Sequence, residues 1–294
     1  MPNAQASLRL TFKSILVPVD FTDASVTALA YARAIAEEYG AKTYIAHALN
    51  PTPPVFIPME PTHVEMDVEW QDAQTEFKRF LRENSTNGES AEGILARGVT
   101  WNVIQDVVSE CSIDLIVLGS HGKHGLKKLV MGSEAEQIFR QADCPVLTIG
   151  PNVAPPSHDG IGFKHILFAT DFSGGSLRAL PYALSLSEEN QANLSLLHVI
   201  PMVPAQHQKQ IAETALEKLR DLIPPETENW YQMAPAVNFE FPAEGILHVA
   251  EEQGADLIVM GVHKRAPRTS SHLPWAIAYE VIRHAHCPVL TVRG

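Results

Sequence analysis

Small residues at a fixed spacing follow one short apolar segment of the chain. Residues 114–118 are followed by Gly119 and Gly122, then by nine residues, and then by Gly132 and Ser133. Glycine at the end of a buried strand lets the backbone turn without a Cβ in the way, and Ser133 opens an amphipathic segment that predicts a helix. Because a helix start offers free N–H groups and the positive end of the helix dipole, this pattern is typical of a loop that binds an anion such as phosphate.

The spacing differs from the better-known phosphate loops. No Gly-Lys-Ser/Thr follows, as a Walker A loop requires, and the glycine offsets are not those of a Rossmann fingerprint. Three lysines lie between Gly122 and Gly132 and could face a phosphate: Lys123, Lys127 and Lys128. The alternative is that each glycine only makes a turn between a strand and a helix.

The spacing Gly-x2-Gly-x9-Gly-Ser resembles the nucleotide-binding signature of the universal stress protein family, in the subgroup that binds ATP. The resemblance covers nearly the whole chain, twice. It implies two doubly wound α/β domains of the adenine nucleotide alpha hydrolase-like type, each with a five-stranded parallel sheet of order 3-2-1-4-5.

The resemblance also implies roles for individual residues of the first half. Asp20, which follows Pro18 and Val19, would take the ribose or the adenine edge, and Ala48 would lie against the base. The ribose and phosphates would be held by Gly119, His121, Gly122, Gly132 and Ser133, together with the amides of Glu134 and Ala135.

Elementary chemistry can be set beside these roles. A carboxylate at Asp20 can accept hydrogen bonds from two ribose hydroxyls, although an acid at a strand end also serves as a helix cap. Ala48 is smaller than the valine usual in the family, so the base pocket is expected to be looser. No catalytic residue and no metal ligand is assigned, because the histidines lack the spacing of a closed metal site and Ser120 is outside a Gly-x-Ser-x-Gly elbow.

Length and composition limit the class of protein. The 294 residues suit two domains, and 45% hydrophobic with 19% charged residues is ordinary for a globular protein. The formal net charge of −12 argues against nucleic acid or an anionic membrane as a partner. No segment has the apolar length of a signal peptide or a spanning helix, so we expect a cytoplasmic protein. The chain has three cysteines, an odd number, so we do not expect a framework of disulfide bonds.

Alternating apolar strands and amphipathic helices predict the elements of the first half. Strands are expected at residues 13–20, 43–48, 91–96, 114–118 and 145–149, and helices at 24–39, 64–84, 101–110 and 133–141. Such alternation implies a parallel sheet with right-handed crossovers. In sheets of this kind ligands bind beyond the carboxyl ends of the strands, where the strand order reverses.

The pattern then restarts. Asp171-Phe172 repeats Asp20-Phe21 and His198 repeats His47 at the same offset, while Cys287-Pro-Val-Leu-Thr repeats Cys144-Pro-Val-Leu-Thr. Residues 1–150 and 163–294 are therefore predicted to be two domains of one fold, joined by the proline- and glycine-rich linker 151–162.

The second half departs from the signature at most positions. It keeps the first glycine and the histidine, as Gly261 and His263. Lys264 replaces the second glycine, and Trp275 and Ala276 replace Gly132 and Ser133. An indole where the backbone must meet a phosphate should block that mode of binding. We therefore expect ATP in the first domain only, with the second loop stiffening its domain as the alternative.

The last strand of each half, residues 145–149 and 288–293, is an apolar, β-branched sheet edge with no charge before Arg293. Such an edge invites another strand, so we expect the two to pair antiparallel as an intramolecular pseudo-dimer. A further homodimer through other faces is left open.

Three functions remain at this point. The first is a tandem universal stress protein, a stress-response regulator that holds ATP, with Mg²⁺, in its first domain. The second is a slow ATPase or autophosphorylating enzyme that uses Ser133. The third is a scaffold whose second domain docks a protein partner, which the sequence does not identify.

Overall fold

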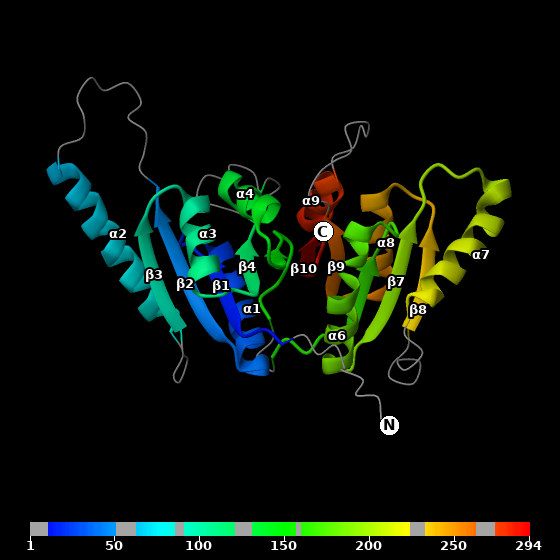
Figure 1. The fold of residues 1–294 in the computed structure, drawn as a ribbon, viewed down its shortest axis with the longest axis horizontal. Coiled ribbons are helices and arrows are strands. Elements are labelled where there is room, and N and C mark those ends of the chain that lie inside the picture. The colour runs from blue at the N-terminus through cyan, green and yellow to red at the C-terminus, as the bar shows by residue number, and fades with distance from the viewer. Residues whose placement is uncertain are drawn as a thin grey trace, which may run out of the picture. The chain divides into compact units, whose positions relative to one another are not determined.

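A computed structural model describes residues 11–50, 63–85, 91–120, 131–156, 160–223, 233–262 and 274–294 (Figure 1). Contacts between elements divide the chain into two compact units, Phe12–Ala142 and Asp143–Gly294. Within the described ranges, no helix combines the length and apolar character that crossing a membrane demands.

The first unit is a parallel sheet with helices packed on it (Figure 1). Its strand order is β3-β2-β1-β4, from β1 (Ser14–Pro18), β2 (Lys42–Leu49), β3 (Ala91–Arg97) and β4 (Leu115–Gly119). The helices are α1 (Asp23–Tyr39), α2 (His63–Glu83), α3 (Thr100–Glu110) and α4 (Ser133–Gln141). The chain moves outward from β1 to β2 and β3 and then returns to β4, so the strand order reverses between β1 and β4.

The second unit repeats this arrangement. Its sheet has the order β5-β10-β9-β6-β7-β8, from β5 (Val146–Ile149), β6 (His165–Ala169), β7 (Asn193–Val199), β8 (Met233–Asn238), β9 (Leu257–Val262) and β10 (Val289–Arg293). Its helices are α5 (Gly174–Leu177), α6 (Leu180–Asn190), α7 (Ala205–Asp221), α8 (Pro242–Gln253) and α9 (Pro274–His284). The order β8-β7-β6-β9-β10 is the predicted 3-2-1-4-5, and the α/β fold class is confirmed.

Buried apolar strands and a repeated acid organise both sheets. All of β4 is buried, and Ile166, Leu167 and Phe168 of β6 have no exposed surface. The Asp114 carboxylate accepts hydrogen bonds from the N–H groups of Lys13 and Ser14 at 2.8 and 3.2 Å, which ties the start of β4 to the start of β1.

Asp256 makes the same contacts in the second unit, accepting from the N–H groups of Lys164 and His165 at 2.7 and 3.1 Å. Burial raises the pKa of the Asp256 carboxyl, and the two N–H donors oppose that rise by stabilising the charged form. Strand β4 therefore begins at Leu115, one residue after the acid with which the predicted strand began. The acid itself joins neighbouring strands.

The predicted antiparallel pair of final strands is confirmed. In the second unit β5 pairs with β10, with Leu147 opposite Leu290 and with Val146 and Thr148 opposite Thr291 and Val289. The Thr291 hydroxyl donates a hydrogen bond to the carbonyl oxygen of Val146 at 3.2 Å. The Thr148 hydroxyl is buried and has no hydrogen-bond partner among the described residues.

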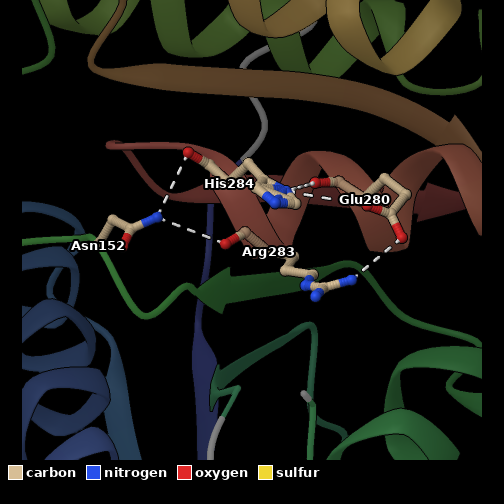
Figure 2. A network of polar contacts seen from close by, with 4 residues as sticks. All are labelled: Asn152, Glu280, Arg283 and His284. Carbon is tan, nitrogen blue, oxygen red and sulfur yellow. Dashed lines mark hydrogen bonds and ion pairs between the residues drawn. The ribbon is translucent and has the colours of Figure 1, made fainter. Parts of the chain in front are cut away.

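The chain leaves β5 against the end of α9. The Asn152 amide donates to the carbonyl oxygens of Arg283 and His284, both at 3.4 Å, and so caps the carboxyl end of that helix (Figure 2). Just before it, a Cβ added at Gly150 would lie 2.4 Å from the carbonyl oxygen of Ile282, so only glycine fits there.

The two threonines of the β5–β10 pair predict opposite responses to the same change. Thr148→Val should leave the free energy of unfolding unchanged or raise it by up to about 1 kcal/mol, because it removes a buried hydroxyl without a partner. Thr291→Val should lower it by about 1 kcal/mol, because it removes a made hydrogen bond. Urea unfolding followed by circular dichroism compares the two variants. A larger loss in Thr148→Val than in Thr291→Val would contradict the assignment.

Candidate functional site

The candidate site lies at the carboxyl ends of β1, β2 and β4. These strands are parallel neighbours, so their carboxyl ends lie at the same end of the sheet. Ala48 is the last residue but one of β2, and Asp20 and Ser120 follow β1 and β4. The Gly132 N–H donates to the carbonyl oxygen of Ser120 at 3.0 Å, which holds the start of α4 at the end of β4. Gly132 and Ser133 are thereby placed beside the end of β4, where the strand order reverses.

The first turn of α4 presents main-chain donors. Gly132 is the N-cap residue, with φ −60° and ψ 145°, and it supplies no side-chain cap. The next three residues, Ser133, Glu134 and Ala135, carry the first N–H groups of the helix, and Ser133 is exposed. These N–H groups lack carbonyl partners within a helix, and the dipole adds a positive field, so the turn can bind an anion.

Two carboxylates of this turn already have partners. The Glu134 carboxylate accepts a hydrogen bond from the Thr100 hydroxyl of α3 at 2.7 Å. The Glu136 carboxylate lies 3.3 Å from the Arg140 guanidinium, one turn further along α4. The Arg140 guanidinium offsets the charge of Glu136, and the Thr100 hydroxyl fixes the position of the Glu134 carboxylate.

The Asp20 carboxylate bonds to residues at the turn into α1. Its Oδ1 accepts hydrogen bonds from the Thr22 N–H at 3.2 Å, the Thr22 hydroxyl at 2.5 Å and the Ser25 hydroxyl at 2.6 Å. In return the Ser25 hydroxyl accepts from the Asp20 N–H at 3.1 Å. These bonds tie Asp20 to the turn before α1, whose N-cap residue is Thr22 and not Asp20, and the ribose role of Asp20 stays a prediction.

The remaining predicted residues of this edge belong to the ladder. Pro18 lies opposite Ala46, and the N–H of the buried Val19 donates to the Ala46 carbonyl at 2.8 Å. Ala48 is half-buried and lies opposite Ala96 of β3. The base role of Ala48 stays a prediction too.

Gly119 has a packing role that the sequence analysis did not assign. A Cβ added there would lie 2.7 Å from the carbonyl oxygen of Ala24, at the start of α1. The corresponding Gly261 is equally restricted, since its Cβ would lie 2.4 Å from the carbonyl oxygen of Gly175. This close approach explains why the glycine persists in a second half that lacks the other small residues.

Some predicted groups cannot be placed. His121, Gly122 and the three lysines of the loop lie outside the described residues, as do His263 and Lys264. Among the residues that are described, no three His, Cys, Asp or Glu side chains gather in a way that could hold a metal ion.

Cysteine chemistry is not available at Cys287. Burial raises the pKa of this thiol to about 12, with the nearby Asp256 carboxylate adding to the rise. Since the thiolate is the nucleophile, Cys287 is inert at neutral pH and serves in packing.

The equivalent edge of the second unit keeps the contact between the aspartate and the N–H two residues later, but it differs in the serine contact and in the start of the helix. Thr170 replaces Val19, and its hydroxyl lies 2.9 Å from that of Ser176, whereas the equivalent Ser25 bonds to Asp20. Asp171 is exposed and accepts from the Ser173 N–H at 2.9 Å. Helix α9 begins at Pro274, which has no N–H, and Trp275 follows in its first turn. This turn offers fewer main-chain donors than the first turn of α4.

One contact of the site was missed in the sequence. The His47 ring lies against Phe21, with ring centroids 4.3 Å apart, and the His198 ring lies against Phe172 at 4.5 Å. The repetition of both residue types in the two halves was the available signal, but it says nothing about contact.

Comparison with known proteins follows the same division. The model of the "Universal stress protein family" matches residues 11–150 and again 162–293. A universal stress protein of Methanocaldococcus jannaschii is 30% identical over 139 residues, which are 47% of this chain and 82% of that protein. Universal stress protein A homolog 1 of Coxiella burnetii is 28% identical over 140 residues, 47% of this chain and 96% of that protein.

One solved structure is similar over both units. The crystal structure of a universal stress protein from Archaeoglobus fulgidus has a TM-score of 0.71 and 20% sequence identity, covering 95% of this chain and 98% of that one. At this identity the likeness shows the fold.

The packing role of Gly119 is testable apart from any ligand. Gly119→Ala should lower the free energy of unfolding by about 1–3 kcal/mol, because the added methyl must displace the main chain of α1. Gly162→Ala is the matched control, because no atom lies within 4 Å of a Cβ built there. Thermal unfolding of both variants without nucleotide gives the comparison. Equal midpoints would show that α1 yields without cost.

Proposed function

The chain belongs to the universal stress protein family as a tandem of two such domains, and we propose that it binds ATP through the first of them. The physiological setting of this proposal is the cytoplasm. The observation that carries it is the corner formed by Ser120, Gly132 and α4, which sets uncapped main-chain donors at the reversal of strand order.

The phosphate side of the site is supported by backbone geometry. Gly132 has no Cβ, so a phosphate can approach its main chain closely. The N–H groups of Ser133, Glu134 and Ala135 would supply donors without using a side chain, and the exposed Ser133 hydroxyl adds one more. The carboxylates of this turn are held by Thr100 and Arg140 rather than facing outward unpaired.

The nucleoside side is supported by two neighbouring strand ends. Asp20 would hold the ribose or the adenine edge, and the small Ala48 leaves room for the flat face of a base. A phosphate-only ligand would use neither residue. Their place beside the α4 corner favours a whole nucleotide over free phosphate as the ligand.

The proposal concerns the nucleotide itself, and Mg²⁺ is not part of it. The second domain is left out as a nucleotide site. In the repeat, Trp275 and Ala276 of α9 correspond to Gly132 and Ser133, and the preceding Pro274 has no N–H, so both the donors and the space are reduced.

Copying the second domain into the first gives a direct test. Gly132→Trp should abolish ATP binding, because the indole occupies the approach to the α4 amides. The φ of −60° at this residue suits any L-amino acid, so the fold should persist. Isothermal titration calorimetry measures the affinity, and Gly162→Trp places the same indole at an exposed site as a control. An affinity for ATP within about threefold of wild type, roughly 0.6 kcal/mol, would place the phosphates elsewhere.

The two domains should bind unequally. Equilibrium dialysis is expected to give one ATP per chain, because only the first domain has the small residues and the donors at its corner. Native mass spectrometry of the purified protein, with ligand extraction, identifies any nucleotide that is retained, and phosphate release over hours in the same sample detects slow hydrolysis. Two equivalent sites per chain would contradict the assignment to the first domain. A protein that neither retains nucleotide through purification nor binds added ATP would contradict the proposed function.

A further inference from the structure

The same histidine contact recurs at the carboxyl end of the first strand pair in each unit. The Nδ1 atom of His47 lies 2.7 Å from the carbonyl oxygen of Val19, and the Nδ1 atom of His198 lies 2.7 Å from that of Thr170. Because a carbonyl oxygen can only accept, Nδ1 carries the proton and donates in both rings. The hydrogen bond therefore sets the orientation of each imidazole.

The bond closes the strand pair where the ladder ends. The last described ladder bond between β1 and β2 runs from the Val19 N–H to the Ala46 carbonyl at 2.8 Å. One residue further along β2, the His47 ring reaches back to the Val19 carbonyl. Since the next residues are Asp20 on one strand and Ala48 on the other, this bond is the nearest crosslink to both.

The ring also holds the residue on the other side of Asp20. Phe21 has a φ of 67°, a left-handed conformation that is strained for a bulky residue and must be held by its surroundings. The centroid of its ring lies 4.3 Å from that of His47, 5.4 Å from that of Phe80 and 6.3 Å from that of Phe77. His47 thus contacts both neighbours of Asp20, through a hydrogen bond to Val19 and through packing on Phe21.

We propose that His47 is a positioning residue of the nucleotide site, which sets Asp20 against Ala48 by holding Val19 and Phe21. This role rests on the function proposed above. In this role His47 does not contact the ligand. It fixes the nucleoside side of the site and leaves the phosphate corner, built from Ser120, Gly132 and α4, unaffected.

The second domain provides the matched control. His198 makes the same two contacts, with the Thr170 carbonyl and with Phe172, but lies in the domain without the small-residue corner. The two histidines should therefore contribute similarly to stability. Only His47 should contribute to nucleotide binding.

Three variants separate the two contacts and the two roles. His47→Phe keeps an aromatic ring and removes the donor, His47→Asn keeps a short N–H donor and removes the ring, and His198→Phe repeats the first change in the second domain. Calorimetry with ATP and with inorganic tripolyphosphate gives affinities, and thermal unfolding without ligand gives stability. Tripolyphosphate has no ribose or base, so it reports the phosphate corner alone.

We expect His47→Phe to weaken ATP at least tenfold, about 1.4 kcal/mol, with tripolyphosphate affinity within about twofold of wild type. His47→Asn should recover part of the ATP affinity, and it tests the donor even where the Phe variant folds poorly. His198→Phe should leave ATP affinity unchanged while lowering the unfolding midpoint as much as His47→Phe does.

Two results would overturn the role of His47. One is ATP affinity in His47→Phe and His47→Asn equal to wild type, and the other is a parallel loss of ATP and tripolyphosphate, which a general loosening of the domain would give. Wild-type protein that binds no ATP would instead overturn the proposed function, and the role of His47 with it.

Discussion

Parallel strands that separate at their carboxyl ends leave main-chain N–H and C=O groups without ladder partners, and the fold must supply others. In the first unit the His47 ring donates to the carbonyl of Val19, and the Gly132 N–H donates to the carbonyl of Ser120. The Ser25 hydroxyl accepts from the N–H of Asp20. A buried group left unpaired costs about 1–3 kcal/mol, a large share of the roughly 5–15 kcal/mol that stabilises a domain. The residues that close the sheet are therefore also the residues that shape the edge of the site.

The two halves of the chain show which of these closures the sheet requires. Both units contain the acid that joins the first strand to the fourth, the histidine that bonds at the end of the first strand, and the glycine that lets the helix after the first strand approach closely. The uncapped small-residue corner at the start of α4 is present in the first unit, whereas the start of α9 carries proline and tryptophan. The shared features serve packing and main-chain pairing, and the unshared ones are those that a bound anion would need.

The tandem arrangement also resolves a problem of sheet edges. An uncharged edge strand such as β5 offers a row of unpaired groups that invites association with other chains. Pairing with β10 within the second unit satisfies that edge inside the chain, around Leu147 and Leu290. The family model matches each half of the chain in turn, so both such strands lie in a single polypeptide.

The sequence by itself determined the α/β class, the internal repeat, the antiparallel final strands and the position of Gly132 at a helix start. The class, the repeat and the helix start follow from local periodicity, helix and turn signals and repeated spacing. The strand pairing follows from two uncharged apolar sheet edges and from the resemblance to the family. Element ends came within two residues, because the change from apolar to polar residues marks them well.

Only the tertiary structure decided what Gly119, Asp20 and His47 do. Gly119 faces the main chain of Ala24, Asp20 bonds to Thr22 and Ser25 at the turn into α1, and His47 bonds to a carbonyl that follows the neighbouring strand. Spacing along the chain reveals that such residues recur but not which distant segment each one meets. That choice is made when parallel strands far apart in sequence pack side by side, because each main-chain group they leave unpaired takes the nearest donor or acceptor that the packing brings to it.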